Sequence, residues 1–491
     1  MEGPPPCGPR TRRSHGITHI FRGFCLLRLY LNKEVFFILG MVLRTDITRE
    51  MANVELGDAR LQQRVERILQ RLQENPQGTL VGAMQGRAEL AATYRFLHNE
   101  AVCAEELITS HALASRERMQ ACARVLCIAD TSFIGYGHRA AVPGLGPQSR
   151  ATDNGFFIHP LFAVSSEGLT LGTLHWQCWA REAGVSKYKT QSRRAVSEKE
   201  SVRWLHSLHA MAEVQRQLEH TRLTYVTDRE GDFYELLAAA VDSKLDFIIR
   251  AQSDRLLDDG RRIGEPPTHT PALGTVRFAM AGRPGRTARE VTQTLWAQRL
   301  RLSARRGKKR TAGVEVTVIW AREDNPPAGE EPVQWILLTN LPVTTLEQAA
   351  QIVDWYRLRW RIEMLFDALK NVCGIEKAQL REAAALQNLC ALHLIVAWRI
   401  LYLKTLAREC PHLPATCLFS TEELTVLTHA LPATAQPLDT LQQAITALAM
   451  LGGYLARKHD KPPGLKTLAR GHQRLCLLVA FHQRITAQRC V

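Results

Sequence analysis

Hydrophobic and polar positions follow a helical period toward both ends of the chain and form short apolar runs between them. Residues 56–72 (LGDARLQQRVERILQRL) carry apolar side chains at helical spacing behind Asp58, and residues 88–107 continue in the same basic style. We therefore predict a helical domain over residues 41–119. A basic helical module can dock on DNA, but a solvated helical bundle has the same pattern.

Short apolar runs begin at residue 124. Residues 124–130 (RVLCIAD) and 222–228 (RLTYVTD) both end in an acid and are typical of buried strands, as are residues 245–250. Two apolar runs predict a hairpin over residues 156–179, and residues 198–218 have the period of a helix. Strand, hairpin, helix, strand, helix and strand is the order of a ribonuclease-H-like α/β core, although many α/β folds share it.

A β-rich insertion is predicted over about residues 251–342, because β-forming residues, prolines and arginines dominate there. It contains a basic run from Arg299 to Arg310, which fits a solvated hairpin, or a surface that follows a phosphate backbone if a nuclease site lies beside it. One long helix is then predicted to carry residues 352–369, and further helices continue to the end of the sequence.

The fold class is therefore α/β, with a ribonuclease-H-like core and a β-rich insertion flanked by helical N-terminal and C-terminal domains. We place an extension over residues 1–40, a helical domain over 41–119, an α/β domain over 120–410 and a helical region over 411–491. The extension is rich in prolines and arginines and has no clear period, so we expect translation to start near Met41. A disordered basic arm is the alternative.

The balance of charge changes this picture by pointing to a partner. Lys and Arg number 63 against 48 Asp and Glu, a net charge of +15, which favours a polyanion because each neutralised phosphate releases counterions. Charge does not separate DNA from RNA or from an anionic membrane.

The 12 cysteines form no CxxC pair, which disfavours a zinc finger and fits free thiols in a reducing cytoplasm. The most apolar run, Val35–Leu43, is shorter than the roughly 20 residues of a membrane span, so no membrane segment is expected.

Asp130 and Asp228 each end a predicted buried strand. Phosphoryl transfer between nucleic-acid strands uses two divalent ions about 4 Å apart, held by carboxylates on a rigid scaffold. Mg²⁺ prefers oxygen ligands and keeps several waters, so a few carboxylates suffice. An acid at a strand end is also a common turn or helix-cap residue, and position alone leaves both roles open.

The predicted long helix carries Tyr356, Arg359, Glu363 and Lys370 at steps of three, four and seven residues, which return to one stripe of its surface. A core-facing stripe would be apolar. A carboxylate flanked by cations suits a metal ligand beside bound phosphates. The alternative is an exposed, ion-paired face, since Arg359 and Glu363 are four residues apart.

This run, Tyr-x2-Arg-x3-Glu-x6-Lys, resembles the Tyr-Arg-Glu-Lys signature of bacterial insertion-sequence transposases of the IS-four family, and the Tn-five transposase group in particular. Other segments are similar to that family in the same order. LGDARL and TYRFLHN resemble its N-terminal DNA-end-binding domain, and IADTS and TDREGDFYE its two catalytic aspartates. WILLTNLP precedes the signature helix, and LGGY resembles the C-terminal region.

The resemblance implies a metal-binding catalytic triad of Asp130, Asp228 and Glu363, with Mg²⁺ as the cofactor and Mn²⁺ as a substitute. It implies a DDE transposase that cuts double-stranded DNA at terminal inverted repeats and joins the ends to target DNA. It also implies a homodimer, assembled through the region 411–491, in the cytoplasm of a bacterium at the nucleoid. The alternatives are a ribonuclease-H-like nuclease without strand transfer, and a catalytically impaired DNA-binding inhibitor.

The resemblance assigns DNA contacts as well. Tyr356, Arg359 and Lys370 would contact terminal phosphates. Trp335 would stack on a flipped-out base, although a buried strand tryptophan is an equally good interpretation from the sequence. Arg250, which ends a predicted strand, is a further DNA contact that we expect.

One position departs from the family pattern. Four residues after Glu363 the family commonly has a basic residue, and this chain has Asp367. An acid one helical turn from Glu363 is expected to repel phosphate or to disturb metal binding. The departure leaves the triad intact and puts full activity in question.

Overall fold

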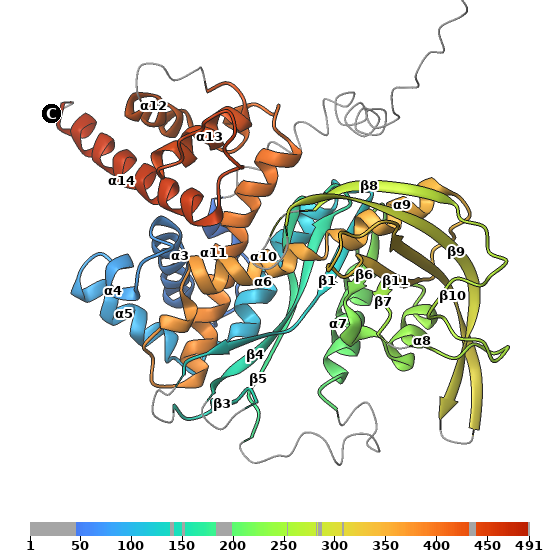
Figure 1. Cartoon of the computed structure of the whole chain (residues 1–491). Coiled ribbons are helices and arrows are strands. Elements are labelled where there is room, and N and C mark those ends of the chain that lie inside the picture. The colour runs from blue at the N-terminus through green and yellow to red at the C-terminus, as the bar shows by residue number, and fades with distance from the viewer. Residues whose placement is uncertain are drawn as a thin grey trace, which may run out of the picture.

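The computed structural model describes residues 46–137, 142–149, 153–182, 199–252, 254–280, 282, 287–306, 309–431 and 438–489. The predictions for residues 1–40 and for Met41 lie outside these ranges. So do the side chains over residues 304–312, which make up much of the basic run. Figure 1 shows helices at both chain ends packed together beside a long twisted sheet.

The N-terminal part is helical as predicted. Its elements are η2 (Ile47–Met51), α3 (Ala59–Glu74), α4 (Leu80–Ala83), α5 (Arg87–Leu97) and α6 (Ala104–Met119). Asp58 accepts a hydrogen bond from the backbone N–H of Arg60 and so caps the start of α3. The predicted apolar stripe of α3 is buried through Val65, Ile68 and Leu69, which fixes this helix against the rest of the protein.

The central sheet has eleven strands among the described residues. They are β1 (Arg124–Ala129), β2 (Ser132–Gly135), β3 (Gly146–Pro147), β4 (Asn154–Ser165), β5 (Thr170–Trp179), β6 (Arg222–Thr227), β7 (Asp246–Arg250), β8 (Gly274–Met280), β9 (Arg289–Arg306), β10 (Lys309–Glu323) and β11 (Gln334–Thr339). The order is β2-β4-β1-β6-β7-β11-β10-β9-β8, and β5 pairs with β4. β1, β6 and β7 run parallel, and the other pairs are antiparallel.

The predicted insertion continues this sheet. β11 pairs antiparallel with β7, so that Leu338 lies opposite Ile249, and β10, β9 and β8 follow outward. The strands β6 and β7 are connected through η5 (Arg229–Gly231) and α8 (Tyr234–Asp242), while α7 (Val202–Arg216) leads into β6. Figure 1 shows α7 and α8 on one side of the sheet and α6 on the other.

The prediction of one long helix over residues 352–369 is wrong. α9 (Leu346–Arg357) ends before α10 (Trp360–Asp367) begins, and a π-helical turn, η6 (Ala368–Val372), follows. Between α9 and α10 the backbone N–H groups of Arg359, Arg361 and Ile362 bond to carbonyls three residues back, which tightens the turn. The tight turn between α9 and α10 shortens the helical period, and the π-helical turn η6 lengthens it. The average spacing of apolar residues is therefore almost unchanged, and the sequence pattern does not show the breaks.

The C-terminal part is built around α11 (Ala383–Glu409). This helix is long and apolar enough to cross a membrane, but 94% of its most apolar window is buried inside the protein. It contacts α3, α5, α6 and β5 as well as the helices near the C-terminus. η7 (Ile375–Lys377) precedes it, and η8 (Ala415–Cys417), α12 (Thr421–Ala430), α13 (Leu441–Leu451) and α14 (Leu465–Arg489) follow.

The first glycine of the LGGY segment lets α13 and α14 approach each other. A Cβ atom at Gly452 would lie 2.1 Å from the carbonyl oxygen of Thr467, and one at Gly471 would lie 1.9 Å from that of Leu448. Real Cβ contacts are never this short, so both positions require glycine.

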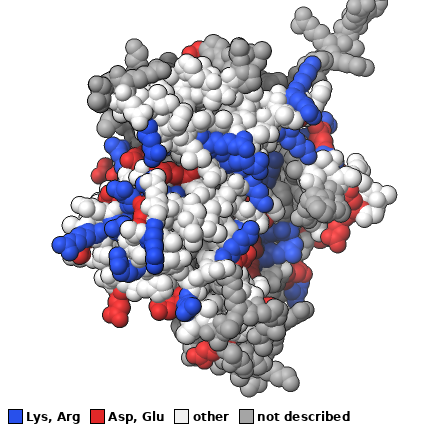
Figure 2. Space-filling view, turned by 90° about the vertical axis from the view of Figure 1, so that its left-hand side faces the viewer, with Lys and Arg blue, Asp and Glu red and all other residues white. Residues whose placement is uncertain are grey.

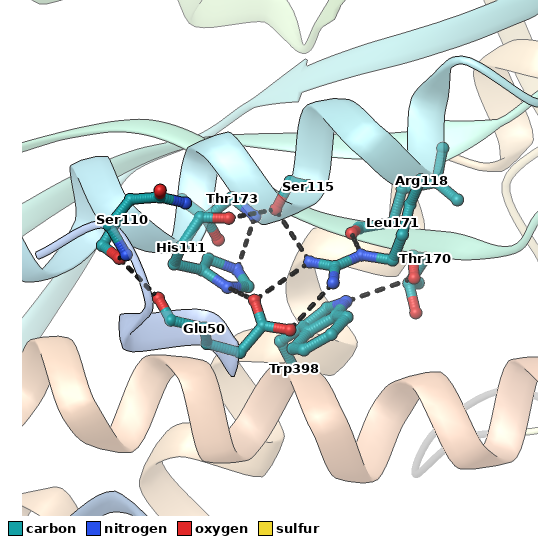
Figure 3. A network of polar contacts seen from close by, with 10 residues as sticks. Glu50, Ser110, His111, Ser115, Arg118, Thr170, Leu171, Thr173 and Trp398 are labelled. Carbon is teal, nitrogen blue, oxygen red and sulfur yellow. Dashed lines mark hydrogen bonds and ion pairs between the residues drawn. The ribbon is translucent and has the colours of Figure 1, made fainter. Parts of the chain in front are cut away.

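A buried polar network joins the N-terminal helices to the sheet (Figure 3). The Glu50 carboxylate accepts hydrogen bonds from Nη1 and Nη2 of Arg118, at 2.8 and 3.1 Å, and lies 2.5 Å from Nδ1 of His111. The backbone N–H of Thr173 in β5 donates to Nε2 of His111 at 3.0 Å, which leaves Nδ1 as the donor to Glu50. Burial lowers the pKa of His111 further than Glu50 raises it, which agrees with this neutral tautomer.

The same network reaches α11. The Arg118 guanidinium lies 4.2 Å from the ring centroid of Trp398, and its Nε donates to the carbonyl of Leu171 at 2.7 Å. Nε1 of Trp398 in turn donates to the carbonyl of Thr170 at 3.2 Å. η2, α6, β5 and α11 are therefore held together by one set of buried, hydrogen-bonded polar groups.

Candidate active site

The two aspartates predicted as catalytic lie at neighbouring strand ends. Asp130 directly follows β1 and Asp228 directly follows β6, and these parallel strands pair with Ile128 opposite Val226. Because the carboxyl ends of parallel strands share one edge of a sheet, both side chains belong to one edge. Asp228 also accepts from the backbone N–H of Glu230 at 2.9 Å and caps η5, so the capping role considered from the sequence is present as well.

The third acid joins this edge through an arginine. Nη1 of Arg359 donates to Oδ2 of Asp130 at 3.0 Å, and Nη2 donates to Oε1 of Glu363 at 2.5 Å. Arg359 is the N-cap residue of α10 and lies in the tight turn, and Glu363 lies in the first turn of that helix. The break in the predicted long helix thus lies at the position that directs Arg359 toward Asp130.

The surroundings of Asp130 raise the pKa of its carboxyl group. Burial is the largest cause, and with the nearby charge of Asp228 it raises the pKa of Asp130 to about 7, against the opposing charge of Arg359. Glu363 adds to the increase in this pKa. Asp228 and Glu363 lie within electrostatic range of Asp130, and the three carboxylates offer hard oxygen ligands, so the donor set fits a divalent cation.

The carboxylates are not gathered closely. Among the described residues there is no group of three or more His, Cys, Asp or Glu side chains placed to hold a metal ion. The Arg359 guanidinium lies between two of the three acids instead.

An aromatic and cationic group adjoins the acids. Tyr356 is buried, and burial raises the pKa of its hydroxyl while the charges of Arg359 and Arg250 oppose the increase. Its ring meets Trp335 edge-on at 5.7 Å. Trp335 is half-buried and stacks on Phe278 at 6.0 Å, with 15° between the planes. Arg250 is hydrogen-bonded to Tyr356. The structure therefore brings Trp335, Tyr356 and Arg250 together beside Arg359.

Lys370 lies apart from this group. Its Nζ donates to the carbonyl of Phe133 at 2.7 Å and lies 3.6 Å from Oε1 of Glu376. With both of these residues it lines an open polar pocket that also includes Thr131 and Ser132, next to Asp130. Because η6 is a π turn, Lys370 does not continue the stripe of Arg359 and Glu363 as an unbroken α-helix would place it.

Sequence reasoning missed a polar group behind Asp130. The Thr131 hydroxyl contacts Nδ1 of His159 at 2.9 Å and accepts from Nε of Arg203 in α7 at 2.9 Å. Arg203 also donates to Glu230 at 2.6 Å. These contacts connect the loops that carry Asp130 and Asp228. The available signals were Thr131, which follows Asp130, and Glu230, which is two residues after Asp228. Nothing in the sequence pattern marks His159 or Arg203.

The interactions of Asp367 are with residues outside the group of three acids. Asp367 is exposed, it accepts a hydrogen bond from Asn371 at 2.8 Å, and it lies within electrostatic range of Lys404 on α11. The charges that act on Asp130 come from Asp228, Arg359 and Glu363.

Basic side chains are spread over the surface of the helices near both ends of the chain (Figure 2). Figure 2 shows more Lys and Arg than Asp and Glu on the face turned toward the viewer, which holds the N-terminal and C-terminal helices. On α3 and α5 the exposed arginines are Arg60, Arg67, Arg87 and Arg95. Such a face favours a polyanionic partner.

Three models of protein families match the chain. A transposase DNA-binding model matches residues 45–102, a transposase DDE domain model matches residues 203–399, and a transposase Tn5 dimerisation domain model matches residues 395–487. The DDE match includes Asp228 and Glu363, while Asp130 precedes it.

Among solved structures, the chain matches a cryo-EM structure of a piggyBac transposase synaptic complex with hairpin DNA, at 8% identity and a TM-score of 0.31. The match covers 76% of this chain and 56% of that one, and a likeness this distant carries no argument about the site. The three family models, in their order along the sequence, show that the chain belongs to the DDE transposases of the Tn5 and IS4 type.

Proposed function

We propose that this transposase performs cut-and-paste transposition with Asp130, Asp228 and Glu363 as its catalytic acids. The observation that carries the proposal is the Arg359 bridge, which joins an acid at the end of β1 to an acid on α10, beside the end of β6. These three acids come from segments more than 90 residues apart in the sequence, yet Asp228 and Glu363 both act electrostatically on Asp130. Titratable groups whose pKa is shifted by burial and by specific charged neighbours cluster at functional sites.

A ribonuclease-H-like core is part of the proposal. The antiparallel strands β1, β4 and β5 on one side, with β6 and β7 added in parallel on the other side of β1, support it. Domain bounds of 41–119 for DNA-end binding, 120–410 for catalysis and 411–491 for dimerisation remain our predictions. They agree with the family matches in order.

DDE transposase domains use divalent metal ions. We propose Mg²⁺, with Mn²⁺ as a substitute, held by the oxygens of Asp130, Asp228 and Glu363. Bound ions would supply Lewis-acid polarisation and would neutralise charge on the attacking and leaving oxygens.

In the proposed reaction a water oxygen attacks the phosphodiester at the transposon end, and a 3′-hydroxyl leaves. That hydroxyl attacks the opposite strand to form a hairpin, and after the hairpin is reopened it attacks target DNA. Arg359 and Tyr356 would bind the terminal phosphates and hold the end in place, and Lys370 would do so from the open polar pocket next to Asp130. Trp335, half-buried against Phe278, would offer its remaining face to a flipped base, with Arg250 beside it.

The proposed substrate is double-stranded DNA that ends in an inverted repeat, bound by a homodimer in which each site cuts the end held by the other subunit. The exposed arginines of α3 and α5 support the DNA partner. We place the protein in the bacterial cytoplasm, at the nucleoid.

The test uses a labelled duplex that ends in the inverted repeat flanking the gene, incubated with the protein and either Mg²⁺ or EDTA. Transposition predicts a nick at the repeat, then a hairpin, and then joined products when target DNA is added. Nicking without joined products would instead identify a nuclease. Binding without nicking would identify an inhibitor and would overturn the proposal.

Replacing Asp367 by Lys is expected to strengthen binding of the DNA end. The exchange puts a cation one turn from Glu363, where DNA passes in the proposed complex, and Asp367 is exposed, so the fold is kept. One added phosphate contact steepens the dependence of log affinity on log salt by about 0.9. Binding titrations at several salt concentrations check this. Lys458→Asp, on the exposed segment after α13, gives a matched change of opposite sign away from the site. An unchanged slope for Asp367→Lys would show that DNA does not pass this position.

A further inference from the structure

Arg359 occupies a place that a metal ion would be expected to use. Its guanidinium bonds to Asp130 at 3.0 Å and to Glu363 at 2.5 Å, and these are two of the three proposed metal ligands. The Arg359 side chain is 15% exposed, and the side chains of its partners are 19% and 32% exposed. The contacts are therefore largely shielded from solvent and are screened less than surface ion pairs.

The guanidinium and a divalent cation would compensate the same negative charge. Burial and Asp228 raise the pKa of Asp130, and Arg359 supplies the charge that opposes this. Arg359 stays protonated at any working pH, so it cannot give up its charge to make room. A cation placed between Asp130 and Glu363 would face the positive charge of Arg359 at close range.

A DNA phosphate could relieve this conflict. Arginine binds phosphate with the same two-pronged geometry that it uses for carboxylates. Arg359 lies at the tight turn between α9 and α10, beside Tyr356 and Arg250, where a phosphate would meet further donors. If Arg359 released the two carboxylates and bound one phosphate instead, Asp130 and Glu363 would be free to bind metal.

We propose that Arg359 closes the metal site in the DNA-free protein and that binding of a DNA end opens it. Metal ions then bind tightly only after DNA has bound, so the active site lacks tightly bound metal ions in the absence of its substrate. This inference rests on the proposed function, because it takes Asp130 and Glu363 as metal ligands. By thermodynamic linkage, bound metal must tighten DNA binding by the same factor.

The test measures Mn²⁺ affinity of the full chain by isothermal titration calorimetry. Wild-type protein is titrated without DNA and with a saturating duplex that ends in the flanking inverted repeat. We expect the duplex to tighten Mn²⁺ binding at least about tenfold, since it withdraws a full charge from close range. Arg359→Gln without DNA should bind Mn²⁺ at least about tenfold more tightly than the wild type without DNA, and the duplex should add little more.

The matched control is Arg357→Gln. Arg357 lies at the end of α9, and its guanidinium pairs with Asp354 and not with the proposed metal ligands. The Arg357→Gln substitution should therefore leave Mn²⁺ affinity unchanged. Arg359→Lys keeps the charge but loses the two-pronged contact, so its affinity should fall between the wild type and Arg359→Gln. A variant that merely loosened the fold would weaken metal binding, which is the opposite of the expected result.

Two failures are distinguishable. Equal Mn²⁺ affinity of the wild type and Arg359→Gln without DNA would overturn the inference about Arg359 and leave the triad standing. The double variant Asp130→Asn/Arg359→Gln tests the triad itself. If it binds Mn²⁺ as tightly as Arg359→Gln alone, Asp130 is not a ligand, and the proposed function fails at that residue.

Discussion

Replacing Glu363 by Gln is expected to lower the rate of metal-dependent DNA cleavage at least about a hundredfold, since loss of groups that merely orient metal ligands already costs 10- to 100-fold. The substitution keeps the size of the side chain but removes the charge that would bind metal. It also removes the charged partner of Arg359 on α10. Cleavage of a repeat-ended duplex, followed with protein in excess, measures the effect.

Binding of the DNA end separates a catalytic loss from a folding loss. Glu363→Gln should still shift the duplex in a gel, because the exposed arginines of α3 and α5 are untouched. Asp354→Asn is the matched control, since it removes an acid from the exposed side of α9, and it should cut at the wild-type rate. If Glu363→Gln cuts as fast as the control, the third catalytic acid lies elsewhere.

Replacing Glu50 by Ala is expected to destabilise the protein by about 3–5 kcal/mol. Glu50 is fully buried, and its loss leaves the Arg118 guanidinium buried with no carboxylate to compensate it. His111 loses its hydrogen-bond acceptor in the same step. Urea unfolding measures the change. Glu55→Ala, an exposed position in the same segment, should stay within about 0.5 kcal/mol of the wild type.

The pH dependence of this stability has a defined sign. Burial alone would raise the pKa of Glu50, but the charge of Arg118 and the hydrogen bonds from His111 and Arg118 lower it to about 2, below the ordinary value of 4.5. A carboxyl group with a lowered pKa stabilises the folded state above its unfolded-state pKa. This contribution is lost as the pH falls from about 4.5 toward 2. Over that range the stability difference between the wild type and Glu50→Ala should shrink, and a constant difference would contradict the assignment.

The strand ends could be predicted from the sequence because apolar runs that finish in an acid are local patterns. Asp130 and Asp228 follow β1 and β6 as predicted, and the pairing of these strands places both acids at one edge. The continuation of the sheet into β11 could not be predicted, since it depends on pairs such as Leu338 with Ile249, which are far apart in the sequence.

The helix that carries the signature shows a second limit. Its residues were assigned to one face on the assumption of a constant 3.6-residue period, which the tight turn at Arg359 and the π turn at Lys370 break. Neither turn needs a proline or a glycine, so composition gives no warning. The buried Glu50 and Arg118 were missed for a related reason. A single charged residue in a helical pattern indicates an exposed face unless its partner, here 68 residues away, is known.

The position of α11 has a consequence for how the protein is made. Helices α3, α5 and α6 and strand β5 all pack against a helix that the ribosome completes only at residue 409. Until then these earlier elements lack α11 as a packing partner, and the apolar faces that it would bury stay exposed to water or to chaperones. Contacts that span this much sequence slow folding and favour completion after synthesis. A nascent chain cut short before α11 should therefore be a target for proteases, and each active transposase must come from a ribosome that has translated past this helix.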